Sequence, residues 1–374
     1  MLLDMAPELV LGDQAGDAPR LFAEWQRVPR LCDEIRIAVD DRGAFGQFIL
    51  TGSSVPADTS EILHSGTGRF ARLRMRPMSL FESGYSTGAV SLEVPFNGAV
   101  LPTDLRNPLS LDELAALICR GGWPEAQEFA GDEAFDYARA YVQRLVREDL
   151  RRVDGVKRNP ERTMALLRAL ARRLWGPVSL AELGADTATG STTGGEHAMG
   201  LYAVRSGVSA LRAAFILEES RAFTPGLGTA TPVRTTPTCW FADPSIAAVA
   251  LGVGPEGLLR DRGLFERLFR NLAVRDLRVY GEAFGAEVRH YRDKTGLTCD
   301  VVICRRNGSF GLVNVVLGGE KTVEDAVRRL KRLEAKLPRG AAGPALMMVV
   351  TGGEPCALRR GDGVCVVPVG CLNS

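Results

Sequence analysis

The sequence predicts an α/β multidomain protein, and three observations lead to that fold class. The chain has 374 residues, which is more than one hydrophobic core usually serves. Its composition of 45% hydrophobic and 24% charged residues is that of an ordinary globular protein. Short apolar runs are separated by segments of helical periodicity, which is the spacing of strands joined by helices.

Charge and cysteine usage exclude several classes of function. The formal net charge is +1, so any affinity for nucleic acid must come from a local patch. The eight cysteines form no Cys-x-x-Cys pair, and His64, His197 and His290 lie far apart, which argues against a zinc site. No apolar run approaches the roughly 20 residues that span a bilayer, and no secretory signal is seen. We therefore expect a cytoplasmic protein with reduced thiols and no membrane contact.

The first predicted unit is a parallel pair of strands joined by a helix. Residues 21–26 and 46–52 are short apolar runs, and the segment 28–40 between them has the periodicity of a helix. Strand, helix and strand at this spacing are typical of a parallel α/β sheet. In the next segment, 68–77, arginine alternates with other residues. We predict a short strand there, with one basic face that carries Arg72, Arg74 and Arg76.

The middle of the chain is predicted to be mostly helical. Residues 110–154 form a helical region that is broken at 121–124. Three more helices and then two strands are expected, at 160–175, 180–183, 204–213, 215–217 and 239–241. Three helices followed by two strands predict a winged-helix module, with the loop 224–237 as its wing. Its recognition helix would present Arg205 and Arg212 to nucleic acid.

The last third of the chain predicts a small α/β domain. A helix is expected at 264–280, followed by a three-stranded meander, a second helix and two more strands. The expected bounds of these later elements are 287–292, 299–303, 310–317, 323–337, 345–351 and 364–369. Turn sequences at 293–296 and 307–308 separate the strands of the meander.

Three stretches carry a resemblance to a known family: LFAEWQRVPRLCDEIRIAVD, GQFILTGSS and GTGRFARLRMRPMSLFESG. Together they resemble a bacterial and archaeal family of AAA-type ATPases that carry a C-terminal domain of unknown function. In that family the first of these strands ends in Asp-Glu-Trp-Gln; here Glu24 and the two residues after it match, and Ala23 departs. The resemblance implies that Thr51 and Ser53 sense the γ-phosphate of ATP. It also implies that Arg69 is an arginine finger for a neighbouring subunit, although a surface position on a basic strand is the commoner role of an arginine.

The phosphate-binding motif of such ATPases is missing from the sequence. Hydrolysis needs Gly-x-x-x-x-Gly-Lys-Ser/Thr, whose amides hold phosphate and whose hydroxyl binds magnesium, and no such motif occurs. About twenty residues precede Leu21, too few for a strand, a phosphate loop and a helix. Ala23 also offers magnesium no ligand. Although ATP and magnesium are the family's cofactors, we expect this chain to use none.

The C-terminal domain resembles the PD-(D/E)xK nucleases in its layout. Glu266 lies on a predicted helix and Asp300 enters a predicted strand, as in that superfamily. Its chemistry needs an Asp and a Glu on a metal ion and a Lys near the attacking water. Asn314 and Val316 stand at the Glu and Lys positions. Because Asp300 alone leaves too little negative charge to hold magnesium, we expect no cleavage.

These resemblances divide the chain into four predicted regions. They are a partial AAA-type core without its P-loop (1–105), a helical lid (106–158), a winged-helix-like module (159–245) and a restriction-endonuclease-like α/β domain (246–374). In the first hypothesis the chain is a degenerate AAA-type protein that acts, if at all, by binding: a full-length relative, another copy of itself, or nucleic acid.

The rival hypothesis is an AAA-type ATPase whose P-loop is lost through a mis-called start or is supplied by another chain. Glu24, Thr51 and Arg69 would then serve ATP hydrolysis. A gene remnant without activity is the third alternative. Nucleic-acid contact would draw on the winged-helix-like module and on basic residues between Arg144 and Arg158.

Overall fold

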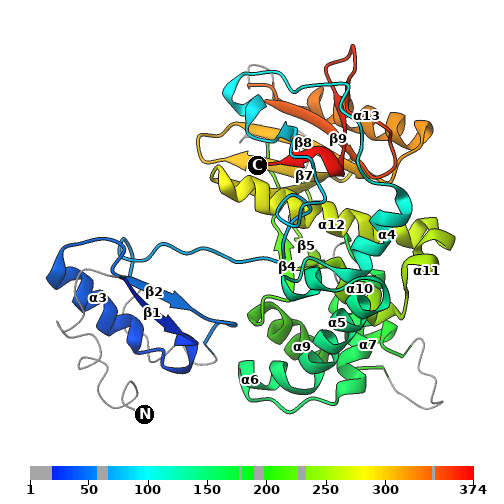
Figure 1. Cartoon of the computed structure of the whole chain (residues 1–374). Coiled ribbons are helices and arrows are strands. Elements are labelled where there is room, and N and C mark those ends of the chain that lie inside the picture. Colours follow the sequence, from blue (N-terminus) through cyan, green and yellow to red (C-terminus); the bar gives the residue numbers. More distant parts are fainter. Residues whose placement is uncertain (1–18, 57–65, 177–178, 189–197, 226–232, 339–341) are drawn as a thin grey trace.

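The computed structural model describes residues 19–56, 66–176, 179–188, 198–225, 233–338 and 342–374. Three bodies follow one another along the chain: a small N-terminal α/β unit, a helical body and a C-terminal body built on a six-stranded sheet (Figure 1). This arrangement confirms the mixed α/β, multidomain class. Within the described ranges, no helix is both long enough and apolar enough to cross a membrane.

The N-terminal unit consists of β1 (Arg20–Ala23), α3 (Leu31–Arg42) and β2 (Phe48–Thr51). The two strands pair in parallel, as predicted, with Leu21 opposite Ile49. Because side chains alternate along a strand, Phe22, Phe48 and Leu50 pack on one face of the pair against the buried residues of α3. The opposite face leaves Leu21 and Ile49 64% and 51% exposed. This unit therefore has one covered and one open apolar face.

The prediction of a strand over residues 68–77 is wrong. Residues 70–76 have no regular secondary structure and cross from the N-terminal unit to the rest of the molecule, as the extended segment in Figure 1 shows. No strand of the described chain pairs with them, so the expected basic face does not form. Instead Arg74 and Arg76 lie 3.4 and 3.0 Å from Glu218.

Glu218 anchors this crossing segment from the buried side of β4 (Leu217–Ser220). Arg278 contributes a third guanidinium, 3.4 Å from the same carboxylate. Burial alone would raise the pKa of Glu218, but Arg278 and Arg76 outweigh it and hold the pKa below its ordinary value. Glu218 is therefore an anion at neutral pH and fixes the end of the crossing segment.

The helical body contains seven helices and a two-stranded antiparallel sheet among the described residues. The helices are α4 (Leu111–Arg120), α5 (Gly131–Arg144), α6 (Leu150–Asp154), α7 (Pro160–Arg172), α8 (Leu180–Asp186), α9 (Leu201–Ala213) and α10 (Pro244–Leu251). Ser110 and Glu113 form a capping box that starts α4. A π-helical turn at Leu145–Asp149 connects α5 to α6.

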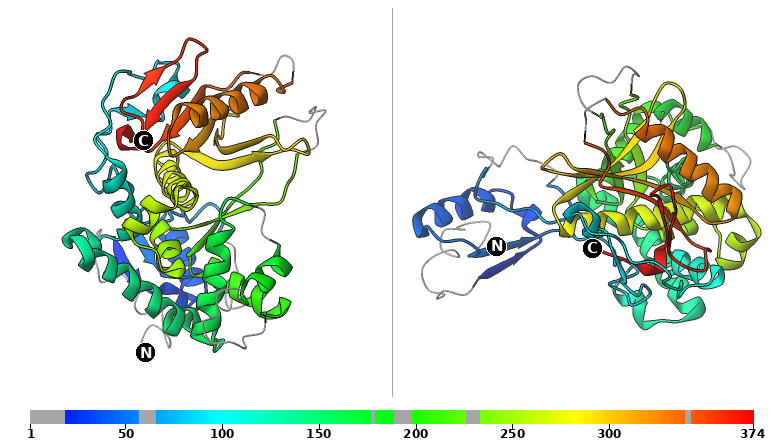
Figure 2. Two further views of the ribbon diagram at one scale, coloured as in Figure 1. Left: turned by 90° about the vertical axis from the view of Figure 1, so that its right-hand side faces the viewer. Right: turned by 90° about the horizontal axis from the view of Figure 1, so that it is seen from above.

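The predicted order of three helices and two strands is present in α7, α8, α9, β4 and β5 (Thr238–Phe241). The described segments 221–225 and 233–237, which follow β4 and precede β5, run away from the helices and reach the C-terminal sheet (Figure 2). There the Phe223 amide donates to the His290 carbonyl, and the Arg234 amide donates to the Arg292 carbonyl. Residues 226–232 of the predicted wing lie outside the described ranges.

The C-terminal body is a sheet in the order β10-β11-β9-β8-β7-β6 with one long helix on each face. Its strands are β6 (Ala286–Arg292), β7 (Thr298–Arg305), β8 (Phe310–Val316), β9 (Leu346–Thr351), β10 (Leu358–Arg359) and β11 (Cys365–Pro368). β8, β9 and β11 are parallel to one another, and β6, β7 and β8 form the predicted antiparallel meander. α12 (Arg262–Ala283) covers one face and α13 (Glu320–Glu334) the other.

Residues 78–109 lie against the helical and C-terminal bodies. β3 (Val90–Ser91) pairs with β12 (Leu372–Asn373) at the very end of the chain, and Arg106 bridges to Cys356. α11 (Pro255–Arg260) then leads from the helical body into α12. The boundary predicted at residue 105 falls inside this stretch.

A buried ionic network joins these bodies around Arg275 on α12. Its guanidinium donates to Asp276 and to Asp243, both at 2.8 Å, and all three side chains are almost wholly buried. Although burial opposes its charge, the two carboxylates raise the pKa of Arg275, so it stays a cation. Asp243 also accepts from the Gly122 amide at 2.9 Å, and Asp276 from the Leu80 amide at 3.0 Å.

Gly122 is required where this network meets the crossing segment. A Cβ atom placed there would lie 2.1 Å from the Met78 carbonyl oxygen, and the Met78 amide donates to the Gly122 carbonyl at 2.6 Å. Only glycine lets the two backbones come this close.

We predict that Arg275→Met destabilises the protein by about 3–5 kcal/mol, because it leaves two buried carboxylates without a cation. Arg139→Met is the matched control: Arg139 pairs with Asp136 at the surface, and exposed pairs contribute about 0–1 kcal/mol. Urea unfolding followed by circular dichroism gives both values. Equal stabilities for the two variants would show that the network does not hold the bodies together.

We predict that trypsin cuts early after Arg72, which is exposed in the crossing segment, and more slowly after Arg74, whose guanidinium lies 3.4 Å from Glu218. Mass spectrometry over a digestion time course should detect a fragment that begins at Leu73 before one that begins at Met75 is seen. The variant Arg72→Gln should delay release of the N-terminal unit. Resistance of the first hundred residues in a monomer would contradict the open structure of this region.

Candidate functional site

The polar residues predicted to sense nucleotide meet at the carboxyl edge of β1 and β2. Glu24 follows β1 in a left-handed conformation, with φ of 56°, and Ser53 lies just beyond β2. The Glu24 carboxylate accepts from the Gln26 side chain at 2.7 Å and from the Ser53 hydroxyl at 3.2 Å. Thr51 stands opposite Ala23 in the same pair of strands. Parallel pairing therefore brings Glu24, Thr51 and Ser53 to one edge, because the carboxyl ends of parallel strands coincide.

The described residues at this edge do not fit a magnesium–nucleotide complex. They supply one carboxylate, Glu24, and it already accepts two side-chain hydrogen bonds. Ala23 adds no oxygen ligand, whereas magnesium in such sites is held by carboxylates together with substrate phosphates. Nowhere in the described ranges do three His, Cys, Asp or Glu side chains gather closely enough to hold a metal ion.

Arg69 is bound within its own unit. Its Nε donates to Asp40 at 2.9 Å and its Nη1 to the Thr67 carbonyl at 3.2 Å, and the side chain is about half exposed. No contact joins Arg69 to Glu24 or Ser53 in the part of the chain that the structure describes. The structure thus leaves Arg69 at the surface, beside the last turn of α3.

An arginine stands between the two predicted nuclease carboxylates. Arg270 on α12 pairs with Glu266 at 2.7 Å, and its Nε lies 4.0 Å from Asp300. Asp300 is buried and also accepts from the Val315 amide at 2.8 Å. A metal ion would have to displace this guanidinium, since both acids already share its charge.

The side chains of Asn314 and Val316 lie on the α13 side of the sheet, away from the Asp300 carboxylate. Val316 packs in the cluster under α13, and the Asn314 amide donates to the Ala326 carbonyl of that helix at 2.9 Å. The Asn314 side-chain oxygen contacts Asp300 through the backbone, because it accepts from the Asp300 amide at 3.2 Å. Arg270 belongs to α12, on the opposite face of the sheet. The reason is the two-residue alternation of a strand: on β8, Val313 and Val315 face the α12 side.

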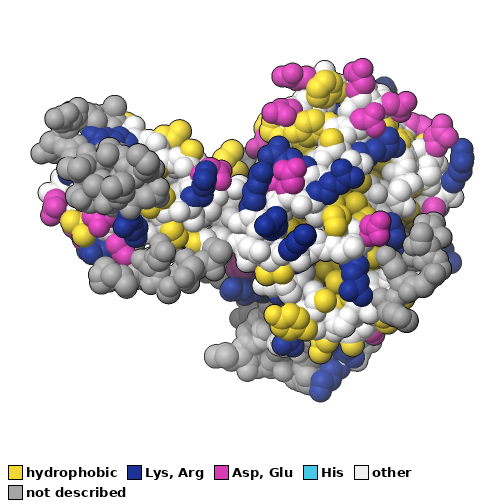
Figure 3. Space-filling view, turned by 90° about the horizontal axis from the view of Figure 1, so that it is seen from below, with side chains coloured by type: hydrophobic (Ala, Val, Ile, Leu, Met, Phe, Trp, Pro, Cys, Tyr) yellow, Lys and Arg dark blue, Asp and Glu magenta, His cyan; other side chains and the backbone are white. Residues whose placement is uncertain are grey.

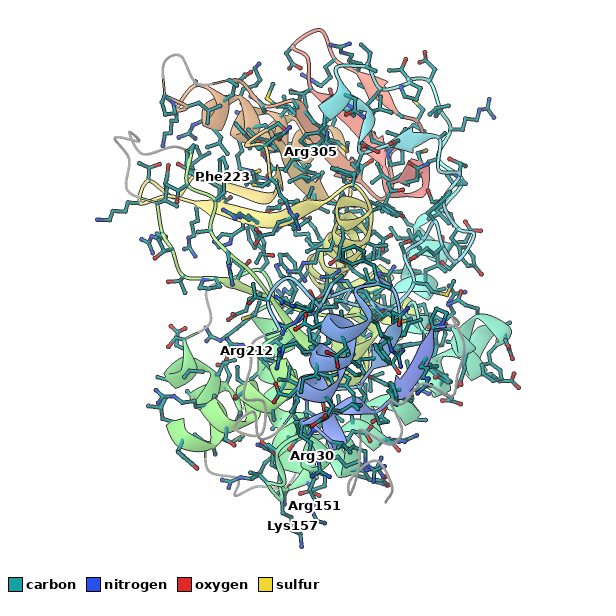
Figure 4. The ribbon with its side chains drawn as sticks, turned by 90° about the vertical axis from the view of Figure 1, so that its left-hand side faces the viewer. Arg30, Arg151, Lys157, Arg212, Phe223 and Arg305 are labelled. Carbon is teal, nitrogen blue, oxygen red and sulfur yellow. The ribbon has the colours of Figure 1, made fainter. Side chains whose placement is uncertain are left out.

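The predicted recognition helix, α9, shows one unpaired arginine. Arg205 is exposed and has no ion-pair partner among the described residues, whereas Arg212 forms an ion pair with Glu219 on β4. Figure 4 shows Arg212 well above Arg151 and Lys157, which point outward at the lower end of the molecule. The space-filling view of that lower face shows Lys and Arg side chains across it (Figure 3). Arg144, Arg152 and Arg158 nearby are paired with acids of their own segment.

Sequence reasoning missed a cleft lined by arginines, which we call the arginine cleft. It has a volume of about 640 Å³ and lies where the end of α7, the start of α12 and the end of β6 meet. Its basic lining residues are Arg172, Arg173, Arg267, Arg270 and Arg292. The only sequence signals are the pair at the end of α7 and the three-residue spacing of Arg267 and Arg270 on α12, since the fifth arginine comes from a distant strand.

His290, the described histidine, takes no part in these sites. His290 is buried, with its Nδ1 3.0 Å from the Ser220 carbonyl, and burial lowers its pKa, which favours the neutral ring. His64 and His197 lie outside the described ranges.

Comparison with known families identifies two regions of the chain. A family described as an AAA domain matches residues 6–83, which supports an AAA-type domain at the N-terminal end. A domain of unknown function (DUF8612) matches residues 111–257, which are the helical body from α4 into α11. No curated protein and no solved structure gives a significant match to the chain.

We predict that Asn314→Glu combined with Val316→Lys yields no manganese-dependent cleavage of DNA. Both new charges would lie in the buried face under α13, where the nearest groups are apolar side chains and backbone, so the variant should lose several kcal/mol of stability. A plasmid-nicking assay and a thermal melt measure the two outcomes. A stable variant that nicks plasmid would restore the predicted nuclease layout.

Proposed function

We propose that this chain is an ATPase-like protein of the AAA type that acts by binding a partner and neither hydrolyses ATP nor cleaves nucleic acid. The observation that carries the proposal is that the three acids of the predicted ATPase and nuclease sites are all hydrogen-bonded or ion-paired to other protein side chains. Glu24 is bonded to Gln26 and Ser53, and Glu266 and Asp300 share one arginine. Each acid is thereby bonded to protein groups. Glu24 is a single carboxylate, and Arg270 offsets the charges of Glu266 and Asp300, so neither position offers the concentrated negative charge that a metal would need.

The open face of the β1–β2 pair supports a protein partner. Leu21 and Ile49 stand opposite each other and are largely exposed, and the outer edges of both strands are unpaired among the described residues. Exposed apolar faces and free strand edges favour association. Another copy of this chain or a full-length relative would cover both.

The basic residues support nucleic acid as the second class of partner. Arg205 on α9 and the outward-pointing Arg151 and Lys157 have no acidic partner among the described residues. Since the net charge of the chain is only +1, such contacts would be local and weakened by salt. The winged-helix-like order of α7, α8, α9, β4 and β5 is part of this proposal.

Calorimetry with ATP tests the central claim. We predict no tight, magnesium-dependent binding of ATP to the purified chain and no difference between it and the variant Glu24→Gln. The reason is that Ala23 and the hydrogen-bonded Glu24 leave magnesium without ligands at this edge. ATP binding that requires magnesium and is lost in Glu24→Gln would favour the rival hypothesis of a working ATPase.

A further inference from the structure

The arginine cleft has an excess of positive side chains in its lining. Five arginines and two glutamates, Glu182 and Glu266, line it, a surplus of three positive charges. The whole chain has a net charge of only +1. The cleft therefore concentrates in one hollow a positive potential that the rest of the molecule lacks.

Both glutamates of the cleft already form ion pairs with arginines of the cleft. Glu182 pairs with Arg173 at 2.9 Å, and Glu266 pairs with Arg270 at 2.7 Å. Arg267 and Arg292 have no carboxylate within ion-pairing distance in the described chain. Arg267 is instead positioned by one hydrogen bond, 3.1 Å from its Nη1 to the Arg172 carbonyl. Two guanidinium groups thus face the cleft with donors left for an anion.

Trp175 forms part of the wall and is held in a strained conformation. Its φ is +76°, a left-handed backbone that a bulky side chain rarely adopts and that costs about 1–3 kcal/mol. The Arg270 guanidinium lies 4.4 Å from the centre of its ring. The strained residue is thus the one whose indole holds Arg270 in place in the cleft wall. Residues with strained backbones are concentrated at binding sites.

We propose that the arginine cleft binds the phosphate backbone of a nucleic acid strand, which rests on the proposed function and assigns it a site. Planar guanidinium groups match the geometry of phosphate and are weakly hydrated, which suits binding in a hollow. Three elements supply the arginines, so consecutive phosphates can be contacted from different sides. They are the end of α7 with Arg172 and Arg173, α12 with Arg267 and Arg270, and β6 with Arg292.

The same lining predicts binding without sequence preference. Asn and Gln, which read adenine, do not occur in the cleft. The side-chain acceptors of its lining are the two glutamates, and each is paired with an arginine. Arginine can also contact guanine, but the lining offers no side chain that matches the other bases, so we expect mainly charge-assisted contacts to phosphate, which position a strand without reading it.

Fluorescence anisotropy tests this site with a fluorescein-labelled single-stranded oligonucleotide and with the corresponding duplex. Each phosphate contact contributes roughly half a decade of affinity between about 50 and 200 mM salt. We expect Arg267→Ala/Arg292→Ala to weaken binding about tenfold or more and to lower the salt slope by about 1.4 for a single strand. Whichever of the two probes binds more tightly identifies the strand form.

Arg139→Ala/Arg328→Ala is the matched control, because it removes two exposed arginines that pair with acids and do not line the cleft. It should bind like the unaltered protein. Arg267→Lys/Arg292→Lys keeps the charges and should recover part of the affinity, which a mere loss of folding would not allow. Circular dichroism melts confirm that each variant is folded.

Three outcomes overturn the assignment. In the first, neither oligonucleotide binds at low salt. In the second, the cleft variant and the control variant bind equally well. In the third, inorganic phosphate competes as well as an unlabelled oligonucleotide of the same total phosphate concentration. If binding survives in the cleft variant but is lost in Arg205→Ala, the cleft is excluded while the proposed binding function stands. Magnesium-dependent ATP binding would instead remove the proposed function itself.

Discussion

The buried Arg275 is the interaction on which the arrangement of the larger part of the molecule depends. Its two carboxylate partners come from the turn before α10 and from α12 itself, and each also accepts a backbone amide from the segments around Leu80 and Gly122. Four stretches distant in sequence therefore converge on one cation. In a medium of low dielectric constant a buried charge is tolerated only when its partners are all in place. The network therefore both stabilises the four stretches and fixes their positions relative to one another.

The same physical solution recurs at the other buried acids. Glu218 is surrounded by Arg74, Arg76 and Arg278, and Asp300 lies beside Arg270. Arginine suits this use because its charge persists when buried and its fork satisfies several acceptors. Acids neutralised in this way hold the fold and are not available to bind metal. The arginine cleft differs, because Arg267 and Arg292 in its lining have no carboxylate partner among the described residues.

The N-terminal unit contrasts with these tightly joined bodies. It has a small core around Leu31 and Ile35, an open sheet face, and a connection that becomes fixed only where Arg74 and Arg76 reach Glu218. A two-stranded sheet buries little apolar surface, so its stability by itself is limited. That limitation is consistent with a unit that is completed by association with another protein.

The sequence alone determined most of the elements, because their signals are local, although the strand predicted over 68–77 does not form. The alternation around Leu21 and Ile49, the capping residues Ser110 and Glu113 and the turns of the meander each specify structure within a few residues. It also determined that Ala23 and Val316 could not serve the chemistry expected at those positions. Only the tertiary structure decided which charges meet. Three features depend on contacts between residues far apart in the chain: the segment around Arg74 crosses to a buried glutamate, Asn314 faces α13, and Arg267 and Arg292 share a cleft. Such contacts leave no periodic pattern in the sequence.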